Sequence, residues 1–478
     1  MNSRTKIVAT LGPASDPEEV LDAMLLAGVD VVRLNLSHGH LDQHIARLLA
    51  VREAATRTGC VVAVLADLPG PKVRAAAFPD GGLELEAGSM VTMVPDLDVS
   101  SQDVIGVDYE TLREDLHCGD RVVLGDGAIT LGVEQITPDG VECLVRSGGH
   151  AQGRPGVHLP SERLRFQTPT EEDLVLAAAM VKQGADFLAV SFVRGADDLR
   201  KVRASVAPLT TRLVAKIETL AAIEHLDEII AASDAVMVAR GDLGIECPLE
   251  DVPHMQKRIV RVCVEAGVPV ITATQMMESM ITAPSPTRAE VSDVANAVFD
   301  GTDALMLSAE TAIGVDPVNV VRTMARVAER AERDADYAHW ADHLGRLQRT
   351  SFPEGPDRIT MALTHAAGLA ATDAGADAIL CCTRSGRTAL AMARFRPAAR
   401  LVGLSPDLAT VRSLALSWGV ESVQVETYTT TDELVWHAVE AAVHHGLVSS
   451  GQTVLVLAGA PDRASGASTD VLRIVRVS

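Results

Sequence analysis

The segment Arg212-Leu213-Val214-Ala215-Lys216-Ile217-Glu218 is an apolar run that carries one ammonium and one carboxylate. Its run of Leu, Val, Ala and Ile is typical of a strand buried on both faces of a parallel sheet. Neither charge is expected in such a strand unless something compensates it. Because side chains alternate along a strand, Lys216 and Glu218 face the same space at its carboxyl end. We interpret that space as an active site; a buried structural ion pair is the alternative.

Lysine is scarce in this chain. Six of the 42 basic residues are lysines, which leaves 42 − 6 = 36 arginines. Arginine therefore serves wherever positive charge alone is needed, and a lysine at position 216 indicates a need for an ammonium.

Short β-branched runs alternate with longer helical stretches, which predicts parallel strands joined by crossover helices. Eight such runs predict a TIM barrel with its active site at the carboxyl ends of the strands. The runs are Ile7–Thr10, Val29–Asn35, Val61–Ala66, Phe187–Ser191, Leu213–Ile217, Ala235–Val238, Val268–Thr272 and Ala304–Leu307. Polar residues follow them directly: Ser37-His38-Gly39, Asp67, Ser191, Lys216 with Glu218, Arg240-Gly241-Asp242, Thr274-Gln275 and Ser308-Ala309-Glu310.

The rhythm of strands and helices predicts three domains. Residues 1–70 and 161–340 form the barrel, and residues 71–160, with short strands and Gly and Asp turns, form an inserted β domain able to close as a lid. A charged helix around Val321–Arg333 leads into an irregular boundary near Phe352–Pro356. Residues 355–478 then read as an open α/β sheet domain.

Composition restricts the function. A formal charge of −22 disfavours nucleic acid and anionic membranes as partners, so an anionic substrate needs a local basic pocket. Seven cysteines without metal-binding spacing indicate reduced thiols and no zinc site. No apolar run approaches the length of a membrane span, and we expect a cytoplasmic protein.

Several motifs occur in a fixed order along the chain. They are Thr5-Lys6-Ile7-Val8-Ala9-Thr10-Leu11-Gly12-Pro13, Arg33-Leu34-Asn35-Leu36-Ser37-His38-Gly39, Val238-Ala239-Arg240-Gly241-Asp242-Leu243-Gly244, Ala273-Thr274-Gln275-Met276 and Pro286-Thr287-Arg288-Ala289-Glu290. Together they resemble the pyruvate kinase family over nearly the whole chain. The resemblance implies phosphoryl transfer from phosphoenolpyruvate to ADP, giving pyruvate and ATP, in a homotetramer.

The resemblance also implies roles for single residues. Glu218 and Asp242 would bind Mg²⁺, for which Mn²⁺ can substitute. Arg33 would contact the transferring phosphoryl group, and Lys216 would stabilise charge on that group and on the enolate. Gly241 and Asp242 would offer backbone N–H groups to the substrate carboxylate, and Thr274 would help to protonate the enolate through water. The nucleotide phosphates would lie along Asn35, Ser37, His38 and Arg74.

The chain departs from the family pattern at two places. Many members hold K⁺ near the equivalents of Asn35, Ser37, Asp67 and the carbonyl of Leu68, with a glutamate where this chain has Lys72. The Lys72 ammonium can supply that charge covalently, so we expect no K⁺ requirement; a solvated lysine at the lid edge is the alternative. Glu172 replaces a usual lysine, so a nucleotide contact is either missing or supplied by Arg163 or Arg165.

An effector site is expected in the third domain. Thr383, Arg384, Ser385, Gly386 and Thr388 lie between a strand and a helix, where hydroxyl and N–H groups can bind the phosphate of a metabolite. An ordinary capped turn is the alternative.

Two other functions remain open from the sequence. A metal-dependent pyruvate aldolase would share the barrel, the carboxylate pair and an arginine on an enolate, but would lack the lid and the third domain. A catalytically silent metabolite-sensing regulator would not need Lys216, Glu218 and Asp242 together.

Overall fold

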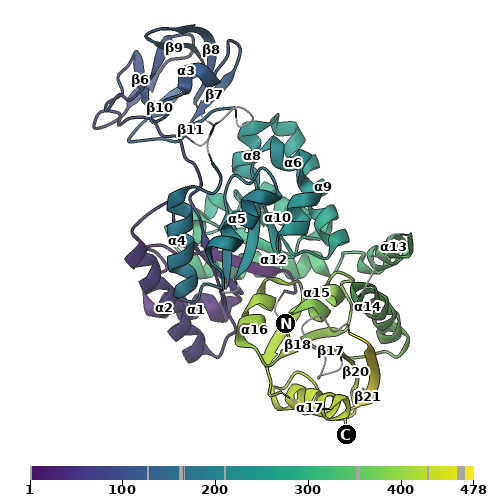
Figure 1. Cartoon of the computed structure of the whole chain (residues 1–478). Helices are drawn as coiled ribbons and strands as arrows, with labels where there is room; N and C mark the ends of the chain where they lie inside the picture. The colour runs from purple at the N-terminus through teal and green to yellow at the C-terminus, as the bar shows by residue number, and fades with distance from the viewer. Residues whose placement is uncertain are drawn as a thin grey trace.

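A closed barrel of eight parallel strands forms the centre of the molecule (Figure 1). The computed structural model describes residues 3–478 except 126, 128, 161–164, 166, 209–210, 351–355, 428–429 and 460–468. The barrel order is β1-β16-β15-β14-β13-β12-β3-β2. The strands are β1 (Lys6–Thr10), β2 (Val31–Asn35), β3 (Ala63–Asp67), β12 (Phe187–Val190), β13 (Arg212–Ile217), β14 (Ala235–Ala239), β15 (Val270–Ala273) and β16 (Ala304–Leu307).

These strands are buried almost throughout, which explains their continuous apolar runs. The predicted TIM barrel is therefore confirmed, with small differences at the strand ends. Helices cover its outside: α1 (Glu18–Ala27), α2 (Leu41–Thr58), α4 (Glu171–Lys182), α5 (Ala196–Ser205), α6 (Leu220–Glu224), α7 (Leu226–Ala232), α8 (Arg240–Glu246), α9 (Val252–Ala266), α10 (Arg288–Asp300), α11 (Ala309–Ala312) and α12 (Pro317–Glu332). Short 3-10 segments occur at Leu249–Asp251 and Glu278–Ile281.

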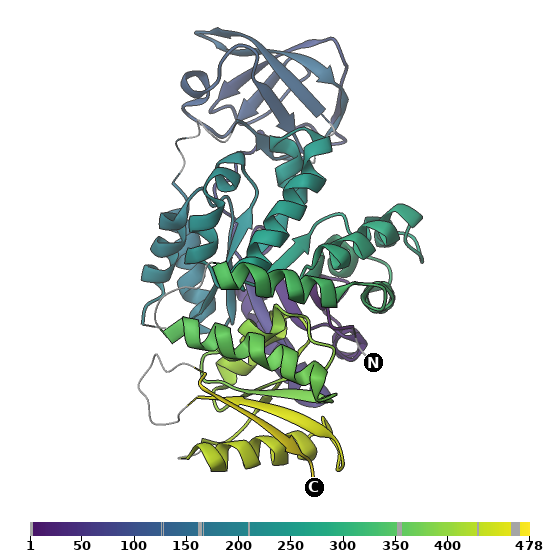
Figure 2. The same cartoon turned by 90° about the vertical axis from the view of Figure 1, so that its right-hand side faces the viewer.

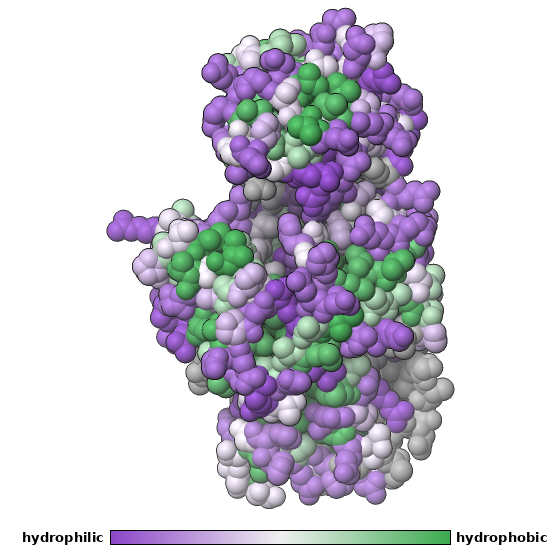
Figure 3. Space-filling model, turned by 90° about the vertical axis from the view of Figure 1, so that its left-hand side faces the viewer, coloured by the Kyte–Doolittle hydropathy of each residue, from purple (hydrophilic) through white to green (hydrophobic). Residues whose placement is uncertain are grey.

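The inserted β domain has its own apolar core and lies above the barrel (Figures 1 and 2). A six-stranded sheet has the order β11-β7-β8-β9-β5-β6, and β10 pairs with β4. The elements are β4 (Leu83–Leu85), β5 (Met90–Pro95), β6 (Val104–Val107), α3 (Leu112–Asp115), β7 (Arg121–Leu124), β8 (Ile129–Thr137), β9 (Gly140–Ser147), β10 (Gly149–Ala151) and β11 (Val157–His158). Figure 3 shows a narrow waist between this lid and the barrel.

The carboxyl-terminal part is a five-stranded sheet of order β19-β18-β17-β20-β21, in which only β21 runs antiparallel. Its elements are α14 (Pro356–Asp373), β17 (Ala378–Cys382), α15 (Arg387–Ala393), β18 (Arg400–Ser405), α16 (Leu408–Ser413), a 3-10 segment at Leu414–Leu416, β19 (Val420–Gln424), α17 (Thr431–His444), β20 (Thr453–Ala458) and β21 (Val471–Arg476). The expected open α/β sheet is confirmed.

This sheet region closes the amino-terminal end of the barrel. Ala415 and Leu416 pack against the apolar cluster inside it. The Asp303 carboxylate, just before β16, lies 3.0 Å from the buried Arg396 guanidinium. It also accepts a hydrogen bond from the backbone N–H of Trp418. The described residues therefore close the lower end by packing, and the cleft described below lies at the opposite end, beneath the lid.

One helix was not predicted. α13 (Tyr337–Thr350) occupies a stretch that the sequence analysis left between the barrel and the boundary near Phe352. Leu344 is fully buried, and Trp340 and Ala341 pack partly buried against the main apolar core. All seven cysteines are free. None of the described helices combines the length and apolar character needed to span a membrane.

Candidate active site

The upper end of the barrel interior is lined by charged side chains. Val31, Leu65 and Val214 belong to the apolar cluster inside the barrel. Because side chains alternate along a strand, the residues two positions further on, Arg33, Asp67 and Lys216, point into the same interior one layer higher. These three residues, far apart in the sequence, thus lie close together at one end of the barrel.

Lys216 lies at the centre of this layer. Its Nζ is 2.8 Å from Glu218 Oε1 and 3.2 Å from Asp67 Oδ1, and it donates to Ser191 Oγ at 2.7 Å. Burial alone would lower the pKa of Lys216, but the carboxylates of Asp67, Glu218 and Asp242 outweigh it and raise the pKa above its ordinary value. The neighbouring carboxylates therefore favour the charged form of this ammonium.

Asp67 also binds the second cation of the site. Its Oδ2 is 2.7 Å from Arg33 Nε, and Arg33 donates a further hydrogen bond to Thr10 Oγ1 at 3.0 Å. Burial raises the pKa of Asp67, but Lys216 and Arg33 more than reverse this and lower it. One carboxylate thus orients both cations that the sequence predicted for the substrate.

Glu218 and Asp242 form the candidate metal pair. Burial, together with the negative charge of Asp242, raises the pKa of Glu218. Glu218 Oε2 accepts the backbone N–H of Phe192 at 2.6 Å. Two mutually repelling carboxylates with hard oxygen donors fit Mg²⁺, which keeps several of its waters. Within the described part of the chain, no cluster of three or more His, Cys, Asp or Glu side chains could hold a metal.

Thr274 lies at the end of β15 and touches the start of α8. Its hydroxyl accepts the Gly241 N–H at 2.9 Å and donates to the carbonyl of Ala273 at 2.6 Å. The predicted proton-delivery residue and the predicted carboxylate-binding N–H are therefore in direct contact. Substrate binding at Gly241 would have to replace this hydrogen bond.

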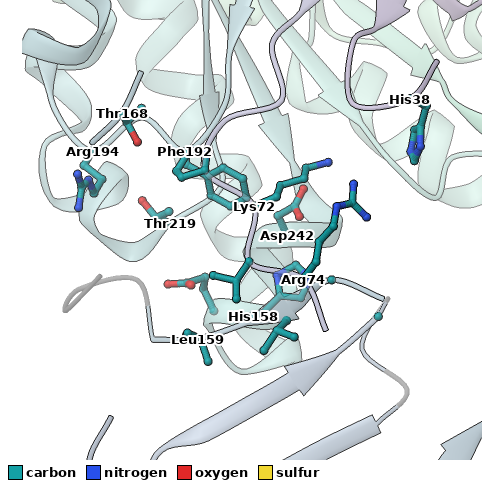
Figure 4. A pocket seen from close by; sticks show the side chains of 16 residues that line it. His38, Lys72, Arg74, His158, Leu159, Thr168, Phe192, Arg194, Thr219 and Asp242 are labelled. Atoms are coloured by element: carbon teal, nitrogen blue, oxygen red, sulfur yellow. The ribbon is translucent and has the colours of Figure 1, made fainter. Parts of the chain in front are cut away.

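A cleft of about 250 Å³ separates the barrel from the lid. Figure 4 shows Lys72, Arg74 and Asp242 in its middle, His38 on one side, and Thr168 and Arg194 on the other. Gly125, His158 and Leu159 contribute from the lid. Partial burial, together with the charges of Lys72, Arg74 and Arg33, lowers the pKa of His38. The cleft is thus locally basic in a strongly acidic protein.

The four groups expected around a monovalent cation all have partners within the protein. Ser37 Oγ accepts from Lys72 Nζ at 2.9 Å, and Asn35 Oδ1 accepts from the Ser37 N–H at 3.2 Å. The Leu68 carbonyl accepts from Ser191 Oγ at 2.7 Å. Asp67 is held by Arg33 and Lys216, as described above. Lys72 therefore binds one of the four groups, the Ser37 hydroxyl, directly.

Arg163 and Arg165 are the two arginines that could substitute for the usual lysine at position 172. Arg165 pairs with Glu114 at 2.8 Å and with Asp115 at 2.9 Å. These pairs hold Arg165 on the lid, away from Glu172 on the exposed first turn of α4. Arg163 lies outside the described residues.

The expected effector loop connects β17 with the seven-residue helix α15. Arg384 and Ser385 are exposed. Thr383 Oγ1 accepts the Gly386 N–H at 3.0 Å, and the Thr388 hydroxyl is paired with that of Thr469 at 2.6 Å. The Ser385 carbonyl accepts from Arg212 Nη2 at 2.6 Å, which ties the loop to the start of β13. Most of the facing loop 460–469 lies outside the described residues.

The sequence analysis assigned no role to two sets of site residues. Ser191 and Phe192 bind Lys216 and Glu218, and Phe192 does so with a left-handed φ of 54°. Arg240 and Asp293 form an ion pair at 2.8 Å behind Thr274. A serine immediately after a barrel strand was a usable signal for Ser191, whereas nothing in the sequence joins Arg240 to Asp293.

A closed α/β barrel with two buried cations, shared carboxylates and a basic cleft at the open end of its strands defines a TIM-barrel enzyme that acts on an anionic substrate. Residues 2–321 match the family model for the pyruvate kinase barrel domain, and residues 361–475 match that for the pyruvate kinase alpha/beta domain.

Curated relatives agree over the full chain. A pyruvate kinase of Geobacillus stearothermophilus is 40% identical over 483 residues, covering 100% of this chain and 81% of that protein. Pyruvate kinases of Sporosarcina psychrophila and Staphylococcus aureus (strain MRSA252) are each 38% identical, covering 98% of this chain and 80% of each relative. The chain belongs to the pyruvate kinase family.

Its activity is accordingly that of a pyruvate kinase, a glycolytic phosphotransferase for which phosphoenolpyruvate and ADP are the implied substrates. The family typically depends on a divalent metal. The chain thus has the lid and third domain that an aldolase would lack, and the comparisons do not favour a silent regulator.

Replacing Lys216 with Met should abolish most of the activity, because charge stabilisation in a transition state is worth several kcal/mol. It should also lower the free energy of unfolding by about 3–5 kcal/mol, because Asp67 and Glu218 lose their shared cation. Lys216→Arg keeps a positive charge and should fold better while remaining impaired. Steady-state kinetics and denaturant unfolding measure both effects, with Lys182→Met as an exposed control. A kcat above about a tenth of wild type, a barrier change under about 1.4 kcal/mol, would contradict the role of Lys216.

Proposed function

We propose that phosphoryl transfer takes place at the layer formed by Arg33, Asp67 and Lys216. The observation that carries this proposal is the contact of Lys216 with both Asp67 and Glu218. In this proposal Arg33 binds the transferring phosphoryl group, and Lys216 stabilises charge on that group and on the enolate. Asp67 orients both cations, so that they act on a charge developing between them without reorganising.

Glu218 and Asp242 are the proposed ligands of Mg²⁺, for which Mn²⁺ can substitute. A bound divalent ion supplies neutralisation of the carboxylate and phosphate oxygens of phosphoenolpyruvate. The Phe192 N–H fixes one oxygen of Glu218, and Asp242 lies in the first turn of α8. The carboxylates of Glu218 and Asp242 also offset the charge of Lys216, which contacts both Glu218 and Asp67.

The substrate carboxylate is proposed to bind the backbone N–H groups of Gly241 and Asp242. Thr274 then lies beside the substrate and passes a proton, through water, to the enolate carbon. The contact between Gly241 and the Thr274 hydroxyl supports this arrangement, because it brings both groups to one place.

The nucleotide phosphates are proposed to lie along Asn35, Ser37, His38 and Arg74. His38 and Arg74 line the cleft, and Lys72 binds Ser37 beside them. A neutral His38 can accept or donate a hydrogen bond there, and Arg74 supplies the charge. Glu172 adds no positive charge. The lysine that usually occupies this position in the family therefore does not contribute to nucleotide binding, and so to the nucleotide KM, in this chain.

Lys72 is proposed to replace K⁺. Its ammonium binds Ser37, while Asn35, Asp67 and the Leu68 carbonyl are bound by other protein groups. A monovalent cation would therefore have to displace existing hydrogen bonds and ion pairs to enter the site.

An effector site is proposed at Thr383, Arg384, Ser385, Gly386 and Thr388 for a phosphorylated metabolite. Exposed Arg384 favours an anion, and the hydrogen bond from Arg212 to Ser385 links the loop to β13, whose far end carries Lys216. A homotetramer belongs to the same proposal, supported by exposed apolar side chains such as Leu249, Phe299 and Trp436.

The domain limits given by the sequence, 1–70 with 161–340, 71–160 and 355–478, are also proposed. With membership of a glycolytic family as its support, we propose a cytoplasmic location.

Glu218→Gln and Asp242→Asn should each raise the Mg²⁺ concentration needed for half-maximal activity by about tenfold or more, because each removes one anionic oxygen. Mn²⁺ should restore part of the activity. Glu224→Gln removes a nearby exposed carboxylate and serves as the control. Metal titrations at saturating substrate make the measurement, and unchanged curves for both variants would put the metal elsewhere.

The enzyme should work without K⁺, because Lys72 places a fixed charge at the cation site. Assays in tetramethylammonium chloride and KCl at equal ionic strength test this. Lys72→Glu should weaken phosphoenolpyruvate binding without K⁺ and regain part of it when K⁺ is added, whereas Lys182→Glu should do neither. Stimulation of the wild type by KCl of about tenfold or more, about 1.4 kcal/mol, would refute the proposal.

A sugar phosphate or a nucleoside monophosphate should lower the KM for phosphoenolpyruvate, because coupling between sites is typically worth about 1–3 kcal/mol. Ser385→Glu should remove the activation by repelling the phosphate, and Ser450→Glu, the same charge change elsewhere in the domain, should not. Initial rates across a panel of phosphorylated metabolites provide the measurement. The site assignment fails if none activates or if Ser385→Glu responds like the wild type.

A further inference from the structure

Thr274 and Gln275 adopt an unusual backbone conformation. Their φ angles are 68° and 53°, two successive left-handed residues, neither of which is glycine. Each such residue costs about 1–3 kcal/mol and persists only where its surroundings enforce it. Because Thr274 is the residue proposed to deliver the proton, whatever enforces this conformation sets the position of its hydroxyl.

Arg240 supplies the enforcing contacts on the carbonyl side. Its Nε donates to the Ala273 carbonyl at 3.1 Å, and its Nη2 donates to the Thr274 carbonyl at 2.5 Å. Nη2 also approaches Met276 Sδ at 2.8 Å. A planar guanidinium with five N–H groups can hold two successive carbonyls at once, which an ammonium cannot do in the same geometry.

The guanidinium is itself held by another helix. Asp293, on α10, accepts from Arg240 Nη1 with both carboxylate oxygens, each at 2.8 Å. Gln256 Oε1 on α9 adds a weaker contact at 3.3 Å. The Arg240 side chain is 11% exposed and that of Asp293 is 35% exposed. The pair is thus largely withdrawn from solvent behind the site.

The residue that follows Arg240 contacts the hydroxyl side of Thr274. Arg240 begins α8, and the next residue, Gly241, donates its N–H to Thr274 Oγ1 at 2.9 Å. Without substrate, Thr274 is therefore fixed at its carbonyl by the Arg240 side chain and at its hydroxyl by the Gly241 N–H. When the substrate carboxylate takes that N–H, the contacts of the Arg240 side chain with the carbonyls of Ala273 and Thr274 still hold the backbone.

We propose that Arg240, oriented by Asp293, is a positioning residue that sets the Thr274 hydroxyl in place for proton delivery, through water, to the enolate carbon. The inference rests on the proposed role of Thr274 in proton delivery. Arg240 itself touches neither the phosphoryl group nor the reacting carbon. Its loss therefore affects formation of the C–H bond of pyruvate, in which a proton is added to the enolate carbon, more than transfer of the phosphoryl group.

The test compares two rates in each variant. One is ATP formation from phosphoenolpyruvate and ADP, and the other is exchange of the pyruvate methyl hydrogens with deuterium in D₂O, the reverse of enolate protonation, followed by NMR with Mg²⁺ and ATP present. The measured quantity is the ratio of exchange to ATP formation. A general loss of folded enzyme lowers both rates and leaves the ratio unchanged.

Arg240→Lys should lower this ratio by about tenfold or more, because the ammonium keeps the charge but cannot hold both carbonyls. Asp293→Asn, which leaves the guanidinium in place but loosens it, should lower it by about threefold or more. Arg52→Lys alters an arginine–aspartate pair of similar burial, 2.7 Å from Asp186, away from Thr274 and should leave the ratio at the wild-type value. If Arg240→Lys does not fold, Asp293→Asn carries the test.

Thr274→Val separates this inference from the proposed function. If Thr274→Val lowers the ratio while Arg240→Lys and Asp293→Asn both remain within about twofold of wild type, Arg240 does not position Thr274 and only the present inference falls. If Thr274→Val itself leaves the ratio unchanged, the proton-delivery role of Thr274 is wrong and the inference falls with it.

Discussion

The Lys216 ammonium, buried between Asp67 and Glu218, is the interaction on which the rest of the site depends. An unpaired ammonium or carboxylate at this depth would cost several kcal/mol, so none of the three can be placed without the others. Eight strands closed into a barrel bring their carboxyl ends to one place, which allows residues from positions 67 to 218 to share one charge network. The fold therefore brings the opposite charges close enough to offset one another, and the cluster in turn fixes the side chains around it.

This constraint spreads into the backbone. Phe192, whose N–H donates to Glu218, has a left-handed φ of 54°. The turned chain then lies so close to Gly70, at the entry to the lid, that a Cβ at Gly70 would be 2.8 Å from both Ser191 and Phe192. Gly70 also has a φ of 68°, so this position requires glycine for two independent reasons. The charge cluster and the start of the lid are thus part of one packed unit.

The sequence predicted the barrel strands because each is buried on both faces and therefore reads as a continuous apolar run. It predicted Lys216 and Glu218 because a charge in or directly after such a run is exceptional, and it placed Asp67 among the polar residues that follow the strands. The role of Arg33 came from the resemblance to the family. The reasoning from the strands placed Ser191 among the polar residues at strand ends, but it could not identify Ser191 as the hydroxyl bound to Lys216, since a serine there is common. It could not predict the left-handed Thr274 and Gln275 either, because neither is glycine, nor the pairing of Arg240 with Asp293, which depends on how α8 and α10 pack. α13 was missed although Trp340, Ala341, Leu344 and Leu347 recur at helical spacing, a pattern that would have predicted it.

The acidity of the whole chain and the basicity of the cleft are connected. With a formal charge of −22, the surface repels anions at long range, but that field is screened within about 8–10 Å at physiological ionic strength. Lys72, Arg74 and Arg194 line the cleft itself, and the deeper Arg33 and Lys216 are shielded from salt by burial. Phosphorylated substrates are therefore attracted only once they are in the cleft. Lys72 adds a positive charge that belongs to the chain itself, and its ammonium donates a hydrogen bond to Ser37 Oγ.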